Sequence, residues 1–140
     1  SDVQKQLDYL AHIPDLWPLK GKITDSFGYR KSPFSRRREF HSGIDIKGNR
    51  GDAVVAAADG TVVLSERKVV WGNLIVINHG NGYKTYYAHN SKLVVQAGEK
   101  VKKGQMIAKV GSTGRSTGPH LHFGIEKNGE FIDPLTVLTD

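Results

Sequence analysis

The chain of 140 residues is 38% hydrophobic, which suffices for the buried core of one globular domain. Its formal net charge of +6 predicts an anionic partner, but the basic residues are neither interleaved with aromatic side chains nor set on a helix suited to a DNA groove, so nucleic-acid binding is not expected. No apolar run approaches the length of a membrane span, and the absence of cysteine excludes a cysteine-based structural zinc site.

We expect residues 1–14 to form an N-terminal helical arm, or the remnant of a linker, ahead of a domain that spans residues 15–140. The helical spacing is carried by three residues, Leu7, Leu10 and Ala11. Pro14 ends the pattern because proline lacks the N–H that a helix interior requires. Ser1 does not look like a natural start, so we expect the natural chain to extend upstream, where a targeting or anchoring segment could lie.

The remainder of the chain has the composition of a β-protein. From residue 16 onward, short runs rich in Val, Ile, Thr and Tyr alternate with glycine-containing turns, and further short strands are expected within residues 58–63 and 98–107. We therefore predict an all-β, mainly antiparallel fold, with a twisted β-sheet and a smaller sheet packed nearby.

Two hairpins can be placed by their turns. The runs 73–78 and 83–89 flank Gly-Asn-Gly, and the runs 120–126 and 130–132 flank Asn-Gly. Asn-Gly favours two-residue turns because both residues tolerate a positive φ. Each pair of runs is therefore predicted to form an antiparallel hairpin.

Four of the six histidines, with one aspartate, fall in three short segments, at residues 41–45, 87–89 and 120–122. In the last segment His120 and His122 alternate with apolar residues, Leu121, Phe123 and Ile125. Successive side chains of a strand point to opposite faces, so the apolar set is expected in the core and the two histidines on the other face. A role in a site is therefore favoured over burial as core histidines.

His41 and Asp45 are four residues apart with Gly43 between them. A helix would place both on one face, but the glycine and the β-rich surroundings argue against a helix. Fully extended, the segment spans roughly 13 Å, too far for two bonds of about 2 Å to one metal ion. We therefore expect a bend at Gly43. Imidazole and carboxylate without thiolate are typical of a catalytic Zn²⁺ that keeps a position open for water.

The remaining histidines are less clear from the sequence. His89 ends a predicted strand on the same face as Tyr87, where a catalytic side chain or a surface histidine are both plausible. His79 is predicted to be structural, in a turn and bonded to its own loop. No chemical role is expected for His12, which precedes the domain.

Three segments of the chain closely resemble the M23 family, the lysostaphin- and LytM-type zinc endopeptidases of bacterial cell walls. They are Phe-His-Ser-Gly-Ile-Asp at 40–45, Tyr-Tyr-Ala-His at 86–89, and Gly-Ser-Thr-Gly-Arg-Ser-Thr-Gly-Pro-His-Leu-His-Phe at 111–123. The resemblance extends from about residue 17 to residue 138. It implies a fold of the duplicated hybrid motif type and one Zn²⁺ per chain. The implied metal ligands are His41, Asp45 and His122, with water completing the tetrahedron.

The same resemblance implies that His89 and His120 are the catalytic pair. The chain has no His-Glu-x-x-His helix to supply a glutamate base. Protons must then be handled by imidazole, whose pKa near 6.5 suits this work at neutral pH. The division of labour between the two histidines stays open. Asn90 and Gly124 depart from residues common in the family, leucine and an acidic or amide residue respectively, which affects the expected shape of the groove.

The implied activity is hydrolysis of peptide cross-links in peptidoglycan by a monomer located outside the cytoplasm, in the cell envelope. D-alanyl cross-links are favoured over glycyl-glycine bridges because the segment 28–34 resembles the envelope-anchored members more. The alternative is a non-enzymatic wall-binding activator of other hydrolases. Such members typically lose metal ligands, whereas this chain keeps all five site residues.

A second resemblance, to biotinyl and lipoyl carrier domains, covers the segments 58–62 and 98–105. Those carriers display an acceptor lysine at a hairpin tip, beside methionine or alanine. The only methionine, Met106, has no lysine beside it. A carrier function is therefore not expected.

Overall fold

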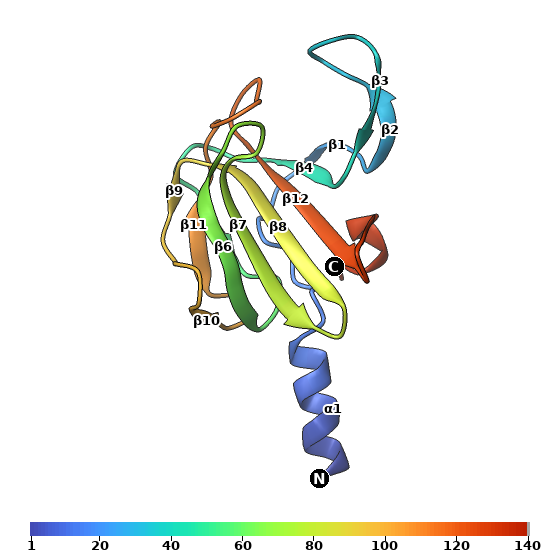
Figure 1. The fold of residues 1–140 in the computed structure, drawn as a ribbon, viewed down its shortest axis with the longest axis vertical. Coiled ribbons are helices and arrows are strands. Elements are labelled where there is room, and N and C mark those ends of the chain that lie inside the picture. Colours follow the sequence, from blue (N-terminus) through green and yellow to red (C-terminus); the bar gives the residue numbers. More distant parts are fainter. Residues whose placement is uncertain (140) are drawn as a thin grey trace.

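The computed structural model describes residues 1–139, which form a mostly antiparallel β-structure with one short helix at the N-terminus (Figure 1). The main sheet has the order β1 (Ile23–Asp25), β4 (Ile44–Lys47), β12 (His120–Lys127), β8 (Tyr83–Asn90), β7 (Gly72–Gly80), β6 (Gly60–Lys68) and β10 (Lys100–Val101), with β13 (Glu130–Ile132) also paired to β12. A three-stranded sheet has the order β5 (Ala53–Val55), β11 (Met106–Lys109) and β9 (Lys92–Leu93), and β2 (Gly28–Lys31) pairs with β3 (Arg38–His41).

Both predicted hairpins are present, and their turns explain why. Gly80 pairs with Tyr83 across Asn81-Gly82, and the pair at the end of β12 and the start of β13 encloses Asn128-Gly129. All four turn residues have positive φ, between 51° and 86°. This is the type I′ conformation, whose twist matches that of the flanking strands.

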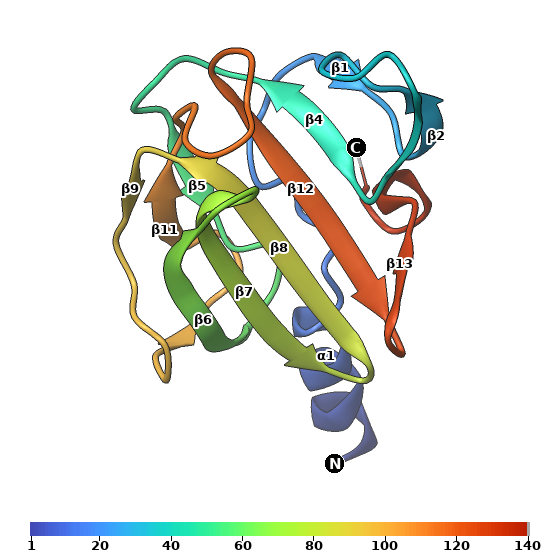
Figure 2. The same cartoon turned by 45° about the horizontal axis from the view of Figure 1, so that its top comes forward.

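The core lies between the main sheet and the three-stranded sheet, whose residues belong to one apolar cluster (Figure 2). On β12, the three predicted core residues Leu121, Phe123 and Ile125 are fully buried in this cluster. The small sheet contributes Val54 and Ile107. The predicted fold class, a twisted antiparallel sheet with a smaller sheet packed against it, is confirmed.

Helix α1 (Asp2–Ala11) projects from one end of the β-structure, as Figure 1 shows, and none of its residues is buried. It ends at Ala11, three residues before Pro14, and the Ala11 carbonyl accepts a hydrogen bond from the Asp59 N–H at 2.9 Å. A short 3-10 helix (Pro134–Thr136) closes the described chain. No helix within residues 1–139 is long and apolar enough to cross a membrane.

His79 lies within β7 and not in a turn. Its ring is buried, and its two nitrogens contact the Asp59 carbonyl at 2.8 Å and the Thr85 hydroxyl at 2.7 Å. The Thr85 hydroxyl also lies 2.7 Å from the Tyr87 hydroxyl, with which it is hydrogen-bonded. The predicted structural role is confirmed, although the partners come from other segments and not from its own loop.

Candidate metal centre and cleft

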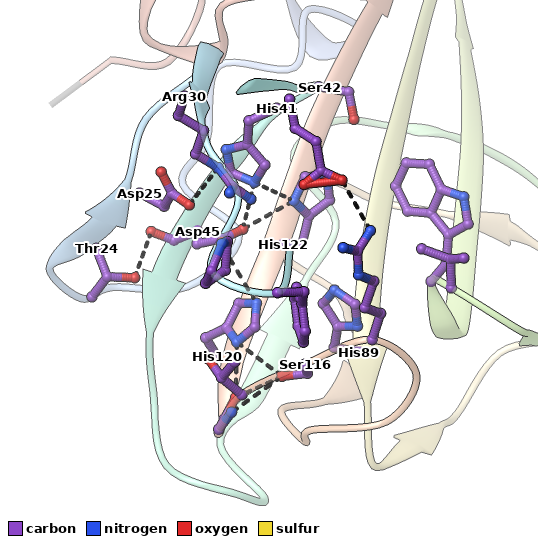
Figure 3. A pocket seen from close by; sticks show the side chains of 18 of the residues that line it. Thr24, Asp25, Arg30, His41, Ser42, Asp45, His89, Ser116, His120 and His122 are labelled. Carbon is purple, nitrogen blue, oxygen red and sulfur yellow. Dashed lines mark hydrogen bonds and ion pairs between the residues drawn. The ribbon is translucent and has the colours of Figure 1, made fainter. Parts of the chain in front are cut away.

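A cleft of about 460 Å³ lies on the face of the main sheet opposite the core. Its walls come from the β2–β3 hairpin and from the loop between β11 and β12, and its floor comes from β4 and β12. Figure 3 shows the side chains that point into it. All five residues singled out in the sequence line it: His41, Asp45, His89, His120 and His122.

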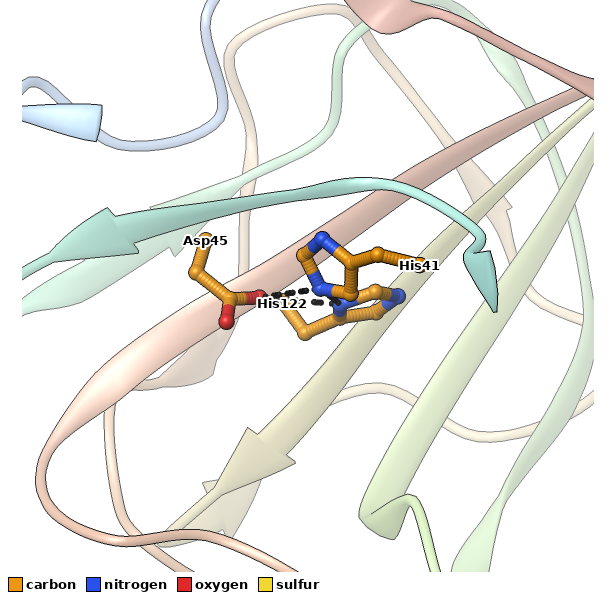
Figure 4. A group of neighbouring side chains, drawn as sticks. All are labelled: His41, Asp45 and His122. Carbon is orange, nitrogen blue, oxygen red and sulfur yellow. Dashed lines mark hydrogen bonds and ion pairs between the residues drawn. The ribbon is translucent and has the colours of Figure 1, made fainter. Parts of the chain in front are cut away.

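Three of these side chains converge on one point (Figure 4). Asp45 Oδ1 lies 3.0 Å from His41 Nε2 and 2.9 Å from His122 Nδ1, and the two nitrogens are 3.1 Å apart. Ligand atoms of a tetrahedral zinc site, with bonds of about 2.0–2.1 Å, lie about 3.3 Å from one another. The triangle formed by the three atoms is therefore close to the size that a zinc ion requires.

The bend between His41 and Asp45 occurs where it was predicted, at Gly43. β3 ends at His41 and β4 begins at Ile44, so the two residues lie on different strands. A Cβ atom at Gly43 would stand 2.2 Å from the carbonyl oxygen of Phe123, on β12. Glycine is required here by the close approach of two backbones, and this approach brings Asp45 beside His122.

The hydrogen-bonding state of His41 leaves its Nε2 atom available to the centre. The Nδ1 atom lies 2.8 Å from the Ser26 carbonyl oxygen, which can only accept, so Nδ1 carries the hydrogen. In the neutral ring Nε2 then presents a lone pair to the Asp45 carboxylate and to His122. Facing lone pairs repel unless a proton or a metal ion lies between them. The donor set of two imidazoles and one carboxylate fits Zn²⁺.

The pKa values of the three groups follow from this crowding. Burial alone would raise the pKa of Asp45, but the rings of His122 and His41 in their protonated forms stabilise the carboxylate and hold the pKa well below its usual range. Burial would lower the pKa of His41, but the Asp45 carboxylate outweighs it and the pKa is raised. Burial lowers the pKa of His122. The carboxylate is thus ionised at neutral pH, as a metal ligand must be.

His122 differs from the other site histidines in the ring nitrogen that points away from the centre. Its Nε2 atom is buried and has no hydrogen-bond partner among the described residues. The ring of Trp71 packs against it with a centroid distance of 5.3 Å. This leaves Nδ1 as the atom that His122 offers to the centre.

His89 reaches the cleft by a backbone conformation that alternation does not predict. The sequence places it on the face of Tyr87, which is fully buried in the core. The structure contradicts this, because His89 has a φ of 65°, and this left-handed conformation turns its ring to the opposite face. Its ring centroid lies 5.0 Å from that of His120.

His89 and His120 each donate Nδ1–H to a backbone carbonyl. The Nδ1–O distance is 2.7 Å from His89 to Thr113 and 2.8 Å from His120 to Gly118. In each neutral ring Nε2 is then the free base. Nε2 of His120 lies 3.6 Å from Asp45 Oδ2. Burial lowers the pKa of His89 to about 4, so its ring is neutral at pH 7.

The two departures noted in the sequence have structural reasons. The amide of Asn90 is fully buried and donates to the carbonyls of Tyr87 and Asn73, which fixes the end of β8 next to His89. Phe131 packs over Gly124, where a Cβ atom would lie 3.3 Å from its ring. The backbone at Gly124 is therefore covered by an aromatic side chain.

Sequence reasoning did not find the residues that hold the histidines in place. Ser26 and Thr113 act through backbone carbonyls, which carry no signal of residue type. Another unforeseen feature is an ion pair across the cleft, with Arg115 Nη1 3.0 Å from Glu39 Oε1. The position of Arg115 inside the 111–123 motif could have drawn attention to it.

Comparisons with known proteins agree with this geometry. The sequence profile of peptidase family M23 matches residues 39–134. The chain is 44% identical over 116 residues to the DD-carboxypeptidase/endopeptidase Mpg of Neisseria meningitidis, covering 83% of this chain and 27% of that protein. It is 41% identical over 123 residues to the murein hydrolase activator NlpD of Escherichia coli, covering 87% of this chain and 30% of that protein.

The chain thus spans less than a third of the length of these curated relatives. Among solved structures, a zinc-containing peptidase from Vibrio cholerae superposes with a TM-score of 0.81 at 38% identity, covering 86% of this chain and 39% of that chain. The profile match includes the three converging residues and both further cleft histidines. The chain belongs to peptidase family M23.

Proposed function

We propose that this chain is a zinc-dependent endopeptidase that hydrolyses peptide cross-links of bacterial peptidoglycan. The observation that carries the proposal is the convergence of His41, Asp45 and His122 within a cleft that also holds two histidines with a free Nε2. His41, Asp45 and His122 hold one zinc ion per chain, and His89 and His120 handle protons.

The chemistry divides between the ion and the side chains. A zinc ion held by three protein ligands supplies Lewis acidity and lowers the pKa of water toward about 7. His89, whose Nδ1–H is held by the Thr113 carbonyl, accepts a proton from water through Nε2. His120, whose Nδ1–H is held by the Gly118 carbonyl, acts in its imidazolium form and donates Nε2–H to the carbonyl oxygen of the scissile peptide bond. The protonated His89 imidazole then delivers its proton to the leaving amine.

The substrate follows from the family and from the named relatives, of which one is a DD-carboxypeptidase/endopeptidase. We infer that the scissile bond is a D-alanyl cross-link rather than a glycyl-glycine bridge, and that the protein acts as a monomer in the cell envelope, outside the cytoplasm.

A second candidate function is activation of other wall hydrolases without catalysis, which the 41% identity to the activator NlpD favours. Against it stands the complete set of ligands and cleft histidines in this chain. An activator has no need for a free base beside a metal site.

Purified sacculi of defined cross-link chemistry separate these functions. The zinc-loaded protein is incubated with D-alanyl cross-linked and with glycine-bridged sacculi, and the soluble fragments are analysed by mass spectrometry. Release of uncross-linked stem peptides from the first substrate supports the proposal, and the Asp45→Ala variant should release none. If the wild type releases nothing, yet a wall amidase releases more in its presence and in the presence of Asp45→Ala, the activator function holds.

A further inference from the structure

An ion pair joins the two walls of the cleft above its floor. Arg115, on the loop between β11 and β12, places Nη1 3.0 Å from Glu39 Oε1 on β3. Its guanidinium carbon lies 4.4 Å from the centre of the Phe34 ring, and Nη2 lies 3.4 Å from the Ser32 hydroxyl. Glu39, Phe34 and Arg115 all line the cleft, so the pair stands where a peptide must pass.

The part-exposed position of the Arg115–Glu39 ion pair allows another carboxylate to replace Glu39. The Arg115 and Glu39 side chains are 38% and 35% exposed, and a part-exposed ion pair adds little net stability. The Phe34 ring supports one face of the guanidinium and fixes its plane. A guanidinium held in this way keeps its N–H groups along one edge, the arrangement that binds a carboxylate with two parallel hydrogen bonds.

Among the three basic side chains that line the cleft, Arg115 is the one that packs against an aromatic ring, that of Phe34. Three acidic residues, Asp25, Glu39 and Asp45, and three basic residues, Arg30, Lys47 and Arg115, line the cleft. Arg30 forms an ion pair with Asp25, with 2.7 Å between Arg30 Nε and Asp25 Oδ2. A zinc ion at the Asp45 centre would make the cleft net positive. An anionic peptide is then favoured over a neutral one.

Glu39 is the natural occupant of the position that a substrate carboxylate would take. Its Oε1 accepts a hydrogen bond from Arg115 Nη1 at 3.0 Å. When a peptide carboxylate replaces it on Arg115, Glu39 turns into solvent, to which it is already partly exposed. One carboxylate is thus exchanged for another of the same chemistry.

We propose that Arg115 is a specificity-determining residue, which binds a free carboxylate of the peptide in the cleft in place of Glu39. The inference rests on the proposed function, because it names the feature of the stem peptide that the cleft recognises. The carboxylate is either the C-terminal one of D-alanine or a side-chain carboxylate of the stem. Both present the same group to the guanidinium.

A purely structural bridge would predict a different pattern of variants. If the pair only fixes the hairpin to the loop, Arg115→Gln and Glu39→Gln remove the same contact and should have the same effect on every ligand. If Arg115 binds the substrate, the two variants act in opposite directions. Arg115→Gln removes the binding group, whereas Glu39→Gln removes its internal competitor.

The test measures binding of the stem tetrapeptide, which has no cross-link to cleave, to the zinc-loaded protein by calorimetry. The peptide is used as the free acid and in forms amidated at one carboxylate at a time, and the form that loses affinity identifies the carboxylate. The wild type should prefer the free acid by about tenfold. Arg115→Gln should show equal affinity for all forms, Arg115→Lys a partial preference, and Glu39→Gln a larger preference than the wild type.

Circular dichroism and the melting temperature establish that each variant is folded, and Arg115→Lys retains the charge if Arg115→Gln is unstable. Equal affinity of the wild type for acid and amide forms, or parallel losses in Arg115→Gln and Glu39→Gln, overturns the inference. The binding ratio is independent of cleavage. An Arg115-dependent preference in a protein that cleaves no sacculi therefore sustains this inference and rejects the proposed hydrolysis, whereas cleavage without any preference does the reverse.

Discussion

At the scale of single residues, the cleft histidines are oriented by the backbone. His41, His89 and His120 each donate Nδ1–H to a carbonyl, of Ser26, Thr113 and Gly118 respectively, and each turns Nε2 toward the cleft. His122 presents Nδ1 instead. The tautomer of each ring is therefore fixed before any ligand arrives, which reduces the cost of organising the site.

His120 and His122 lie two residues apart on β12, yet we expect different losses when each is removed. His122→Ala leaves two of the proposed ligands, too few for a stable catalytic zinc site, so both metal and activity should be lost. His120→Ala should keep about one zinc per chain and lose activity by about 10²–10⁴-fold. Elemental analysis of the two purified variants side by side checks this, with wild type at one equivalent. Metal lost from His120→Ala and retained in His122→Ala would reverse the assignment.

Gly43 sets the approach of β3 and β4 to β12, so a methyl group there should disturb the centre without touching a ligand. Gly43→Ala is expected to lower the free energy of unfolding by about 2–3 kcal/mol and to weaken zinc binding, because the Phe123 carbonyl must move. Gly118→Ala is the matched control, since a Cβ atom there meets nothing within 4 Å. Urea unfolding and zinc titration of both variants provide the measurement. Equal stability of the two variants would contradict the crowding argument.

Much of the site could be predicted from residue types, but its orientation could not. His41, Asp45 and His122 stand out because the ligand chemistry resides in their side chains. The approach of His89 depends on its φ of 65°, a choice that the surrounding contacts enforce and that no local preference of histidine predicts. The carbonyls of Ser26 and Thr113 have the same chemistry in any residue, so the sequence contains no mark of them.

At the scale of the elements, the end of β8 is held by a buried amide network. The side-chain amide of Asn90 donates to the backbone carbonyls of Tyr87 and Asn73. The backbone carbonyl of Asn90 accepts from the side chains of Asn73 and Thr113. Thr113 in turn accepts from His89 through its backbone. The position of His89 therefore depends on contacts among β7, β8 and the loop that precedes β12.

Asn90→Ala should loosen this junction and spare the metal. Two buried carbonyls lose a donor, which lowers the free energy of unfolding by about 2 kcal/mol. Zinc content should stay near one per chain, since Asn90 touches none of the three proposed ligands, while turnover should fall because His89 is displaced. Chemical denaturation, metal analysis and turnover on sacculi are measured on the same preparation. A variant that loses zinc in proportion to activity would contradict this division.

Elements with a local signal were predictable and those that depend on distant pairing were not. The Asn-Gly turns and the alternation along β12 placed two hairpins and one buried face correctly. The three-stranded sheet joins β5, β11 and β9, which are short and far apart in sequence. Strands of two to four residues carry too little pattern to reveal their partners.

At the scale of the whole molecule, buried His79 links stability to pH. Burial lowers the pKa of His79 from 6.5 to about 4 in the folded protein. Between these values the unfolded chain binds a proton that the folded chain does not, so stability must fall as the pH falls through this window. A difference of this size corresponds to about 3 kcal/mol.

We therefore expect the metal-free protein to lose about 3 kcal/mol of unfolding free energy between pH 7 and pH 4 through His79 alone. Urea unfolding of wild type and His79→Gln across this range isolates the contribution, because the other titrating groups are common to both. The variant should be less stable at pH 7 and less sensitive to acid. Parallel curves for the two proteins would exclude His79 as the source.

The N-terminal helix should contribute little to the stability of the domain. Deletion of residues 1–9 removes side chains that are largely exposed, such as Val3 at 67% and Leu7 at 55%, and should change the unfolding free energy by less than about 0.5 kcal/mol. A deletion through residue 13 also removes the Ala11 carbonyl, which accepts from the Asp59 N–H, and should cost more. Denaturation curves of the two shortened proteins test the proposed boundary between 1–14 and the domain.

The distance along the chain between the proposed ligands has a consequence for the order of events in folding. Asp45 and His122 are 77 residues apart, and they meet only when β4 has paired with β12. A chain that ends before β12 holds only two of the three proposed ligands. The β7–β8 hairpin contains none of the three and does not need them to form. Metal binding by the proposed ligands would therefore be a late step in folding. It requires that β4, in the first third of the chain, has paired with β12, in the last third. A chain interrupted before that moment would lack the proposed metal site.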